Sequence, residues 1–193
     1  RYCVRNLANK QFRCNIPTRK AFQKGYLKTQ APPGYVELID FNSNNFDKIE
    51  EAISNSDAVI NLIGILYENR KQKFSKIHSD IPDIISRLCE KHKVKKYIHV
   101  SAIGSNKDSK SAYQRSKFAG EEKSLMNFKN TVIIRQSVVC EPEDNYTNWK
   151  RRTQSLSYVF KEEIENVFSG KDFDKMFEIK GTKHPDIIKE HLQ

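Results

Sequence analysis

The sequence predicts an α/β fold in which helices cover a doubly wound parallel sheet, and two observations predict it. Strand-like runs occur at 58–63, 95–100 and 131–135, and the first and last of them consist mainly of β-branched and other apolar residues, which is typical of buried parallel strands. Segments with apolar residues at helical spacing alternate with these runs, at 46–53, 77–92 and 113–128. Because strand–helix–strand units join parallel strands, this alternation indicates a parallel sheet with helices on its faces.

Two earlier strands are predicted from short apolar alternation, from Phe12 to Ile16 and from Tyr35 to Ile39. The turn between them contains two prolines, which lack an amide donor, and a glycine, which permits positive φ. Beyond about Trp149 the pattern changes to amphipathic stretches, and no further buried strand is expected. We therefore expect an α/β domain at 1–149 and a mainly helical appendage at 150–193.

Composition limits the class of protein without identifying a partner. A chain of 193 residues suits one domain, or one domain with an appendage. The 34 Lys and Arg against 24 Asp and Glu give a formal charge of +10, which favours an anionic partner. Nucleic acid, acidic lipid, an acidic protein, a phosphorylated cofactor or simply a Lys-rich surface would each fit. No run approaches the roughly 18 apolar residues of a membrane span, so we expect no crossing of a bilayer.

The cysteines indicate reduced thiols and no metal site. Cys3, Cys14, Cys89 and Cys140 are scattered, without a CxxC pair or a histidine at zinc-like spacing. A reducing compartment is therefore expected. The first residues contain no Met and no apolar signal core, so we expect either a removed leader or a start within a longer chain.

A tyrosine and a lysine four residues apart are the first candidate site. Tyr113 and Lys117 would lie on one face of a helix that follows the strand ending near Ser101. An ammonium beside a phenol lowers the pKa of the tyrosine, and the same lysine can hold ribose hydroxyls of a nicotinamide cofactor. The alternative is an ordinary pair of surface side chains on a helix.

Two further positions point to a nucleotide. Asn61 and Gly64 follow the most apolar strand, at the end where open α/β sheets bind ligands, although this glycine could simply end the strand. Arg19 and Lys20 follow the first predicted strand, where an acid would accept the ribose 2′-hydroxyl of NAD and a basic residue accommodates the 2′-phosphate of NADP. The same two residues could be a solvated pair. Asp40 follows the second strand and is placed to meet an adenine edge.

In this order the motifs resemble the atypical and extended short-chain dehydrogenases, which have a Rossmann fold. Within them the sequence is most similar to the nucleotide-binding accessory subunits of respiratory complex I and their α-proteobacterial relatives. The segments that carry the resemblance are 59–68, 97–101, 111–117, 120–121, 135–137 and 142–144. The resemblance implies bound NADP(H), with Ser137 among the cofactor contacts. Gln136 stands where the family has proline, and Cys140-Glu141 where it has an aromatic-glycine pair.

Two segments of the family pattern are missing. No Gly-x-x-Gly-x-x-Gly precedes Phe12, and residues 1–8 resemble the helix that follows that loop in the family. We therefore expect the first strand and the glycine loop to lie upstream of Arg1. The later strands of the family's substrate side are absent after Asp144, so residues are expected to be missing there as well.

The resemblance implies a structural rather than a catalytic nucleotide. Ala102 stands where active extended dehydrogenases carry Ser or Thr, which donates a hydrogen bond to the substrate oxygen. The implied role is an NADP(H)-binding accessory subunit, structural or for assembly, with other complex I subunits as partners and no nucleic acid. It would lie on the matrix side of the mitochondrial inner membrane without spanning it, or in the cytoplasm of an α-proteobacterium.

Two other function classes stay open. One is a soluble NADP-dependent reductase or epimerase, with Tyr113 as proton donor, Lys117 as its orienter and Ser101 as hydrogen-bond donor. The other is a nucleic-acid-binding relative, which the basic charge supports weakly. The aromatic residues mostly follow core periodicity instead of forming an exposed stacking platform.

Overall fold

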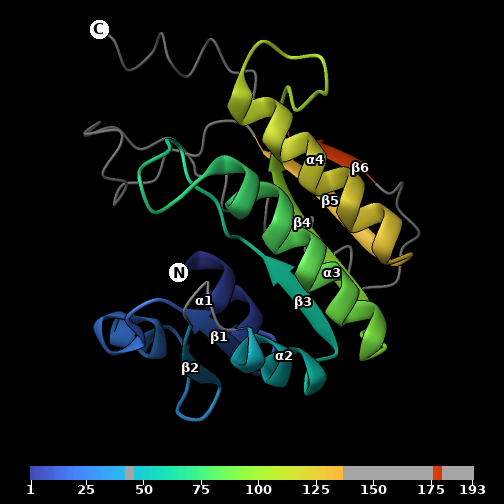
Figure 1. Ribbon diagram of the computed structural model, residues 1–193. Helices are drawn as coiled ribbons and strands as arrows, with labels where there is room; N and C mark the ends of the chain where they lie inside the picture. The colour runs from blue at the N-terminus through green and yellow to red at the C-terminus, as the bar shows by residue number, and fades with distance from the viewer. Residues whose placement is uncertain (42–45, 137–175, 180–193) are drawn as a thin grey trace, which may run out of the picture.

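The computed structural model describes residues 1–41, 46–136 and 176–179, in which helices and strands alternate (Figure 1). The elements of the N-terminal part are α1 Tyr2–Asn9, β1 Cys14–Thr18, the 3₁₀ helix η1 Ala21–Gln30, β2 Val36–Asp40 and α2 Asp47–Ser54. They are followed by β3 Ala58–Asn61, the π-helical η2 Ser75–Asp80, α3 Ile81–Lys91, β4 Lys96–Ala102, α4 Ala112–Asn127, β5 Thr131–Gln136 and β6 Met176–Ile179. The predicted α/β class and strand–helix alternation are confirmed.

All strand pairs in this part of the chain are parallel. β1 pairs with β2, and a second sheet has the order β3-β4-β5-β6. The register sets Asn61 of β3 beside His99 of β4, and Ser101 of β4 beside Arg135 of β5. Figure 1 shows α3 and α4 lying side by side across one face of the four-stranded sheet. The carboxyl ends of β3, β4 and β5 therefore meet at one edge.

The core lies between this sheet and its helices. Tyr97, Ile98 and His99 are successive residues of β4 and are all fully buried, as expected for a strand covered on both faces. Ile81 and Ile85 of α3 pack in the same cluster as Tyr97. Burying each large apolar side chain contributes roughly 1.5–3 kcal/mol, so this cluster fixes the helices against the strands.

Three sequence expectations need correction or limits. A further strand was not expected after Trp149, yet β6 at 176–179 pairs with β5. Its four residues are too few for apolar spacing to separate strand from helix. β1 begins at Cys14 and not at Phe12, because the Phe12 amide bonds to the Leu7 carbonyl in the turn after α1. The boundary near 149 and the rest of 150–193 lie outside the described residues.

Some aromatic residues are exposed, although most of them were expected to follow core periodicity. Phe22 and Tyr26 of η1 and Tyr67 after β3 keep 82%, 49% and 75% of their surfaces exposed. They belong to two separate segments of the chain. In the described residues, no helix has the length and apolar character needed to cross a bilayer.

Candidate functional site

Lys117 lies near the carboxyl end of β4, and it belongs to the helix that the tyrosine–lysine spacing predicted. α4 starts at the Ser111 cap, whose hydroxyl accepts the Gln114 amide at 3.5 Å, and Lys117 follows within the helix. The Lys117 ammonium donates to the Val100 carbonyl at 3.2 Å and is 6% exposed. A β-carbon built at Gly64 would lie 3.3 Å from Lys117 Nζ. The structure thus brings the lysine and the glycine after β3 together.

Burial controls the charge of this lysine. Desolvation lowers the pKa of Lys117 to about 8, and the nearby Glu121 carboxylate opposes that shift. Glu121 is 1% exposed and forms a forked ion pair with Arg135 of β5, with Nη2 2.7 Å from Oε2. The buried Glu121 carboxylate therefore interacts with two cations, Lys117 of α4 and Arg135 of β5.

His78 is a site residue that the sequence analysis missed. Its Nε2 accepts the Ile65 amide at 3.0 Å, and its Nδ1 lies 2.9 Å from the Ser116 hydroxyl oxygen. Because a backbone amide can only donate, Nε2 is the acceptor and the ring proton is on Nδ1. Burial and the Lys117 charge lower the pKa of His78 to about 4, which keeps the ring neutral. One sequence signal could have pointed to His78. Pro82 stands four residues further along the predicted helix and has no amide to donate to the His78 carbonyl.

Tyr113 is held by aromatic contacts. Its ring meets those of His78 and Phe74 edge-on, with centroids 5.2 Å and 5.7 Å away. Burial raises the pKa of the phenol, so the expected lowering by Lys117 is wrong. Lys117 instead directs a hydrogen bond to Val100. Within the described residues, the Tyr113 hydroxyl has no protein hydrogen-bond partner.

Asn61 uses its whole side chain inside the protein. Its oxygen accepts the Ile63 amide at 3.0 Å, which fixes the orientation of the side-chain amide. Its nitrogen then donates to the Tyr97 hydroxyl and to His99 Nδ1, both at 3.2 Å. Asn61 therefore braces the turn after β3. His99 Nε2 is buried, without a partner among the described residues.

Ser101 is buried and its hydroxyl proton is already used. The Ser105 hydroxyl donates to the Ala102 carbonyl at 2.7 Å, so it accepts at its 3.2 Å contact with Ser101. Ser101 must therefore be the donor in that contact. Ala102, the position of the expected missing hydroxyl, follows directly at the end of β4.

The residues predicted to meet the adenine half lie on the other sheet. Arg19 and Lys20 are exposed and follow β1, and Lys20 has a left-handed φ of 53°. Asp40, at the end of β2, accepts the Ala21 amide at 3.1 Å and so ties this turn to β2. Ser137, the remaining predicted contact, lies outside the described residues.

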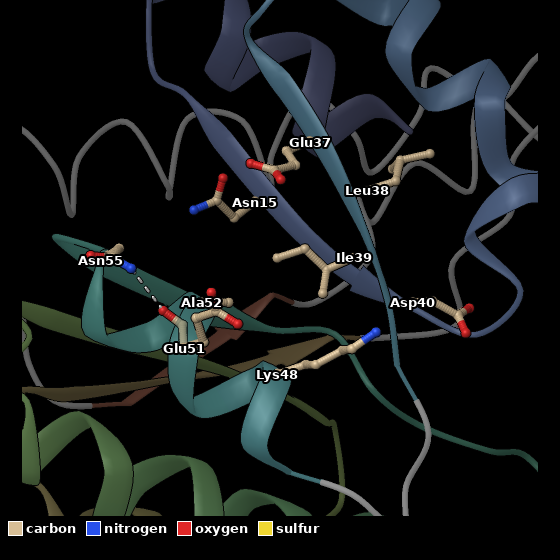
Figure 2. Close-up of a pocket in the computed structure, with 9 residues that line it drawn as sticks. All are labelled: Asn15, Glu37, Leu38, Ile39, Asp40, Lys48, Glu51, Ala52 and Asn55. Carbon is tan, nitrogen blue, oxygen red and sulfur yellow. Dashed lines mark hydrogen bonds between the residues drawn. The ribbon is translucent and has the colours of Figure 1, made fainter.

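A cavity of about 330 Å³ lies between the β1–β2 pair and α2 (Figure 2). It is lined by carboxylates, amides and one lysine together with three apolar residues: Asn15, Glu37, Leu38, Ile39, Asp40, Lys48, Glu51, Ala52 and Asn55. Asp40 is the one predicted site residue among them. Tyr113, Lys117 and His78 do not line this cavity, so it is separate from the site around Lys117.

The described cysteines, Cys3, Cys14 and Cys89, are free thiols. Burial raises the pKa of Cys3 to about 11 and that of Cys89 to about 12, so these thiols stay protonated. Cys140 lies outside the described residues. Within these residues, no group of three His, Cys, Asp or Glu side chains is arranged to hold a metal ion.

In sequence, the chain is similar to subunits of a respiratory enzyme, although no family model matches it. It is 32% identical to the mitochondrial NADH-ubiquinone oxidoreductase 40 kDa subunit of Neurospora crassa, over 75% of this chain and 38% of that protein. It is 29% identical to the mitochondrial NADH dehydrogenase (ubiquinone) 1 alpha subcomplex subunit 9 of Mus musculus, over 97% of this chain and 51% of that protein. The alpha subcomplex subunit 9 of Dictyostelium discoideum is 32% identical, over 82% of this chain and 45% of that protein. The chain thus spans about half or less of the length of these relatives.

Solved structures share the fold at lower identity. A putative NAD-dependent epimerase/dehydratase from Bacillus halodurans has a TM-score of 0.75 at 19% identity, covering 98% of this chain and 92% of that one. The Bordetella bronchiseptica enzyme WbmG, solved with NAD, has a TM-score of 0.74 at 13% identity, covering 100% and 75%. The chain is therefore a sequence relative of the 40 kDa and alpha subcomplex 9 subunits of NADH-ubiquinone oxidoreductase, built on the Rossmann-like fold of the short-chain dehydrogenases and epimerases.

Proposed function

We propose that this chain binds NADP(H) at the carboxyl edge of its parallel strands and serves as an accessory subunit of respiratory complex I without turning the nucleotide over. The observation that carries the proposal is the buried Lys117 ammonium beside Gly64, at the ends of β4 and β3. Among the described residues, Val100 is the one hydrogen-bond partner of this ammonium, which leaves two of its three N–H donors for ribose hydroxyls. Solved relatives of the fold that contain NAD or NADP support this class of ligand.

A preference for NADP(H) follows from charge at the end of β1. Arg19 and Lys20 are exposed there, and residues 19–25, which follow β1, include no acid. The Asp40 carboxylate at the end of β2 reaches this turn, where it accepts the Ala21 amide. Each charge-assisted contact to a 2′-phosphate is worth roughly 1.5–3 kcal/mol, which is about tenfold or more in affinity.

The absence of turnover rests on the end of β4. Ala102 has no hydroxyl, and the Ser101 hydroxyl donates to Ser105. Neither residue offers a donor to an oxygen that gains negative charge near Tyr113. Removing one such donor costs about 3 kcal/mol of transition-state stabilisation in comparable sites.

The subunit role rests on the named relatives, which are mitochondrial complex I subunits. The formal charge of +10 suits a neighbour that is anionic overall. We place the chain on the matrix side of the inner membrane, peripheral to it, with other complex I subunits as partners and without nucleic acid.

Titration calorimetry on the full-length protein tests the nucleotide. NADPH should bind at least about tenfold more tightly than NADH, and Lys117→Ala should weaken both. Lys129→Ala, at an exposed lysine beyond α4, is the matched control and should change neither affinity. Equal affinities would reject the NADP(H) preference, and no binding of either dinucleotide would reject the site. Co-purification of the tagged protein with complex I tests the subunit role separately.

A further inference from the structure

We propose that His78 positions the Gly64–Ile65 backbone against Lys117, and thereby sets the nucleotide affinity of the site. This inference rests on the proposed nucleotide-binding function. Its structural half, the positioning of the Gly64–Ile65 backbone by His78, involves only protein groups. That half can therefore be tested without any ligand.

The loop after β3 is held by two side chains that accept alternate backbone amides. Asn61 accepts the Ile63 amide at 3.0 Å, and His78 accepts the Ile65 amide at 3.0 Å. Gly64 lies between these two points, and its α-carbon faces the Lys117 ammonium. Loss of either acceptor would free the backbone that a nucleotide must approach.

The position of His78 follows from an irregular turn. η2 is π-helical over Ser75–Asp80, and Pro82 has no amide to donate to the His78 carbonyl four residues earlier. That carbonyl instead faces Gly120 of α4, where an added β-carbon would lie 1.9 Å away. This close packing of η2 on α4 holds the imidazole between the loop after β3 and Ser116.

The hydrogen bonds around His78 run in one direction. Ile65 donates to Nε2, Nδ1 then donates to the Ser116 hydroxyl, and that hydroxyl donates to the Tyr113 carbonyl at 2.7 Å. A protonated ring would turn Nε2 into a donor facing the Ile65 donor. The nearby Lys117 charge disfavours protonation of the ring as well. Only the neutral Nδ1–H form completes the chain, so His78 is a fixed acceptor.

Two substitutions separate the acceptor from the shape of the side chain. His78→Phe keeps a planar ring but cannot accept the Ile65 amide, whereas in His78→Gln the side-chain oxygen can reach the position of Nε2. Amide hydrogen exchange of Ile65 and NADPH affinity should both be measured on the full chain. In His78→Phe, we expect exchange to accelerate and NADPH to bind more weakly, each by about tenfold. In His78→Gln, both should stay within about threefold of wild type. His92→Phe, which removes a histidine bonded to Glu50 instead, should change neither.

The outcomes distinguish the two proposals. Unchanged Ile65 exchange in His78→Phe would overturn the positioning role. Faster exchange with unchanged NADPH affinity would overturn the link to the ligand and leave His78 with a folding role only. A wild-type chain that binds no NADPH would overturn the proposed function, and the Ile65 exchange would still decide the structural half.

If His78→Phe does not fold, ¹⁵N spectra of the wild-type histidine ring decide the structural half. A neutral Nδ1–H ring from pH 5.5 to 8 supports the inference, and titration of the ring in that range overturns it.

Discussion

The α-carbon of Gly120 in α4 lies against the carbonyl oxygen of His78 in η2. A β-carbon at Gly120 would stand 1.9 Å from that oxygen and 3.3 Å from Pro82 Cγ. Both neighbours belong to packed helices, so neither can move without disturbing the core. Glycine is required here for close approach of two helices and not for an unusual φ.

Gly120→Ala should therefore destabilise the protein by about 3 kcal/mol or more, because overpacking against backbone cannot relax easily. Gly25→Ala is the matched control, since a β-carbon at Gly25 in η1 would meet nothing within 4 Å. That change should be neutral or slightly stabilising, because it restricts the unfolded chain. Chemical denaturation of both variants measures the difference. Equal stabilities would show that α4 and η2 are not packed as described.

The sequence could predict those site residues whose partners lie nearby in the chain. Tyr113 and Lys117 belong to one helix, as their spacing predicted, although the Lys117 ammonium bonds the Val100 carbonyl and not the phenol. The Asn61–Gly64 segment was placed correctly because a buried strand has a recognisable apolar run and a defined carboxyl end. Local patterns of this kind also predicted every strand from β1 to β5.

Contacts between distant segments could not be predicted in this way. His78 bonds Ser116, 38 positions away, through an irregular turn that a helical pattern does not reveal. The partner of Ser101 was also missed, since donor roles depend on which carbonyl Ser105 meets. β6 pairs with β5 across about forty intervening residues, and nothing in its four residues encodes that neighbour.

Lys117 should make the stability of the protein depend on pH above neutrality. Its pKa is lowered to about 8 in the folded state, against 10.5 as the ordinary value. Between these values the unfolded chain binds the extra proton, so the free energy of unfolding rises with pH, by about 3 kcal/mol. Below pH 8 both states are protonated and this contribution is absent.

Lys117→Met should remove that rise between pH 8 and 10.5, and the exposed Lys129→Met should keep it. Denaturant unfolding at several pH values gives the comparison, and subtracting the curves removes the titration of the other lysines and the thiols. A Lys117→Met curve parallel to wild type would contradict burial of the charged group. The same variant should also lose nucleotide affinity, so these unfolding curves are measured without nucleotide.

Arg19 should discriminate between the two dinucleotides. Arg19→Ala removes a cation from the turn after β1 and should weaken NADPH binding about tenfold, with little effect on NADH. Arg13→Ala, at an exposed arginine before the same strand, is the control and should affect neither ligand. Calorimetry at two salt concentrations provides a second check, since a contact to phosphate weakens as salt rises. A parallel loss of NADPH and NADH affinity in Arg19→Ala would place the arginine near a group that both share.

Tyr113 decides between a bound structural nucleotide and an enzyme. Burial raises the pKa of its phenol, its hydroxyl has no protein partner among the described residues, and Ala102 and Ser101 supply no donor beside it. Tyr113→Phe should therefore leave NADPH affinity within about twofold and complex I assembly in cells unchanged, because the ring contacts with His78 and Phe74 persist. Lys117→Ala in the same assay should lower nucleotide occupancy and melting temperature together, since a bound nucleotide stabilises the fold by mass action.

Oxidation of NADPH by wild type should stay at background with carbonyl substrates, consistent with the loss of about two orders of magnitude in rate for a missing donor. If Tyr113→Phe abolishes the function of the protein in cells while nucleotide binding and complex I assembly stay intact, the reductase or epimerase interpretation is correct. The structural role must then be abandoned.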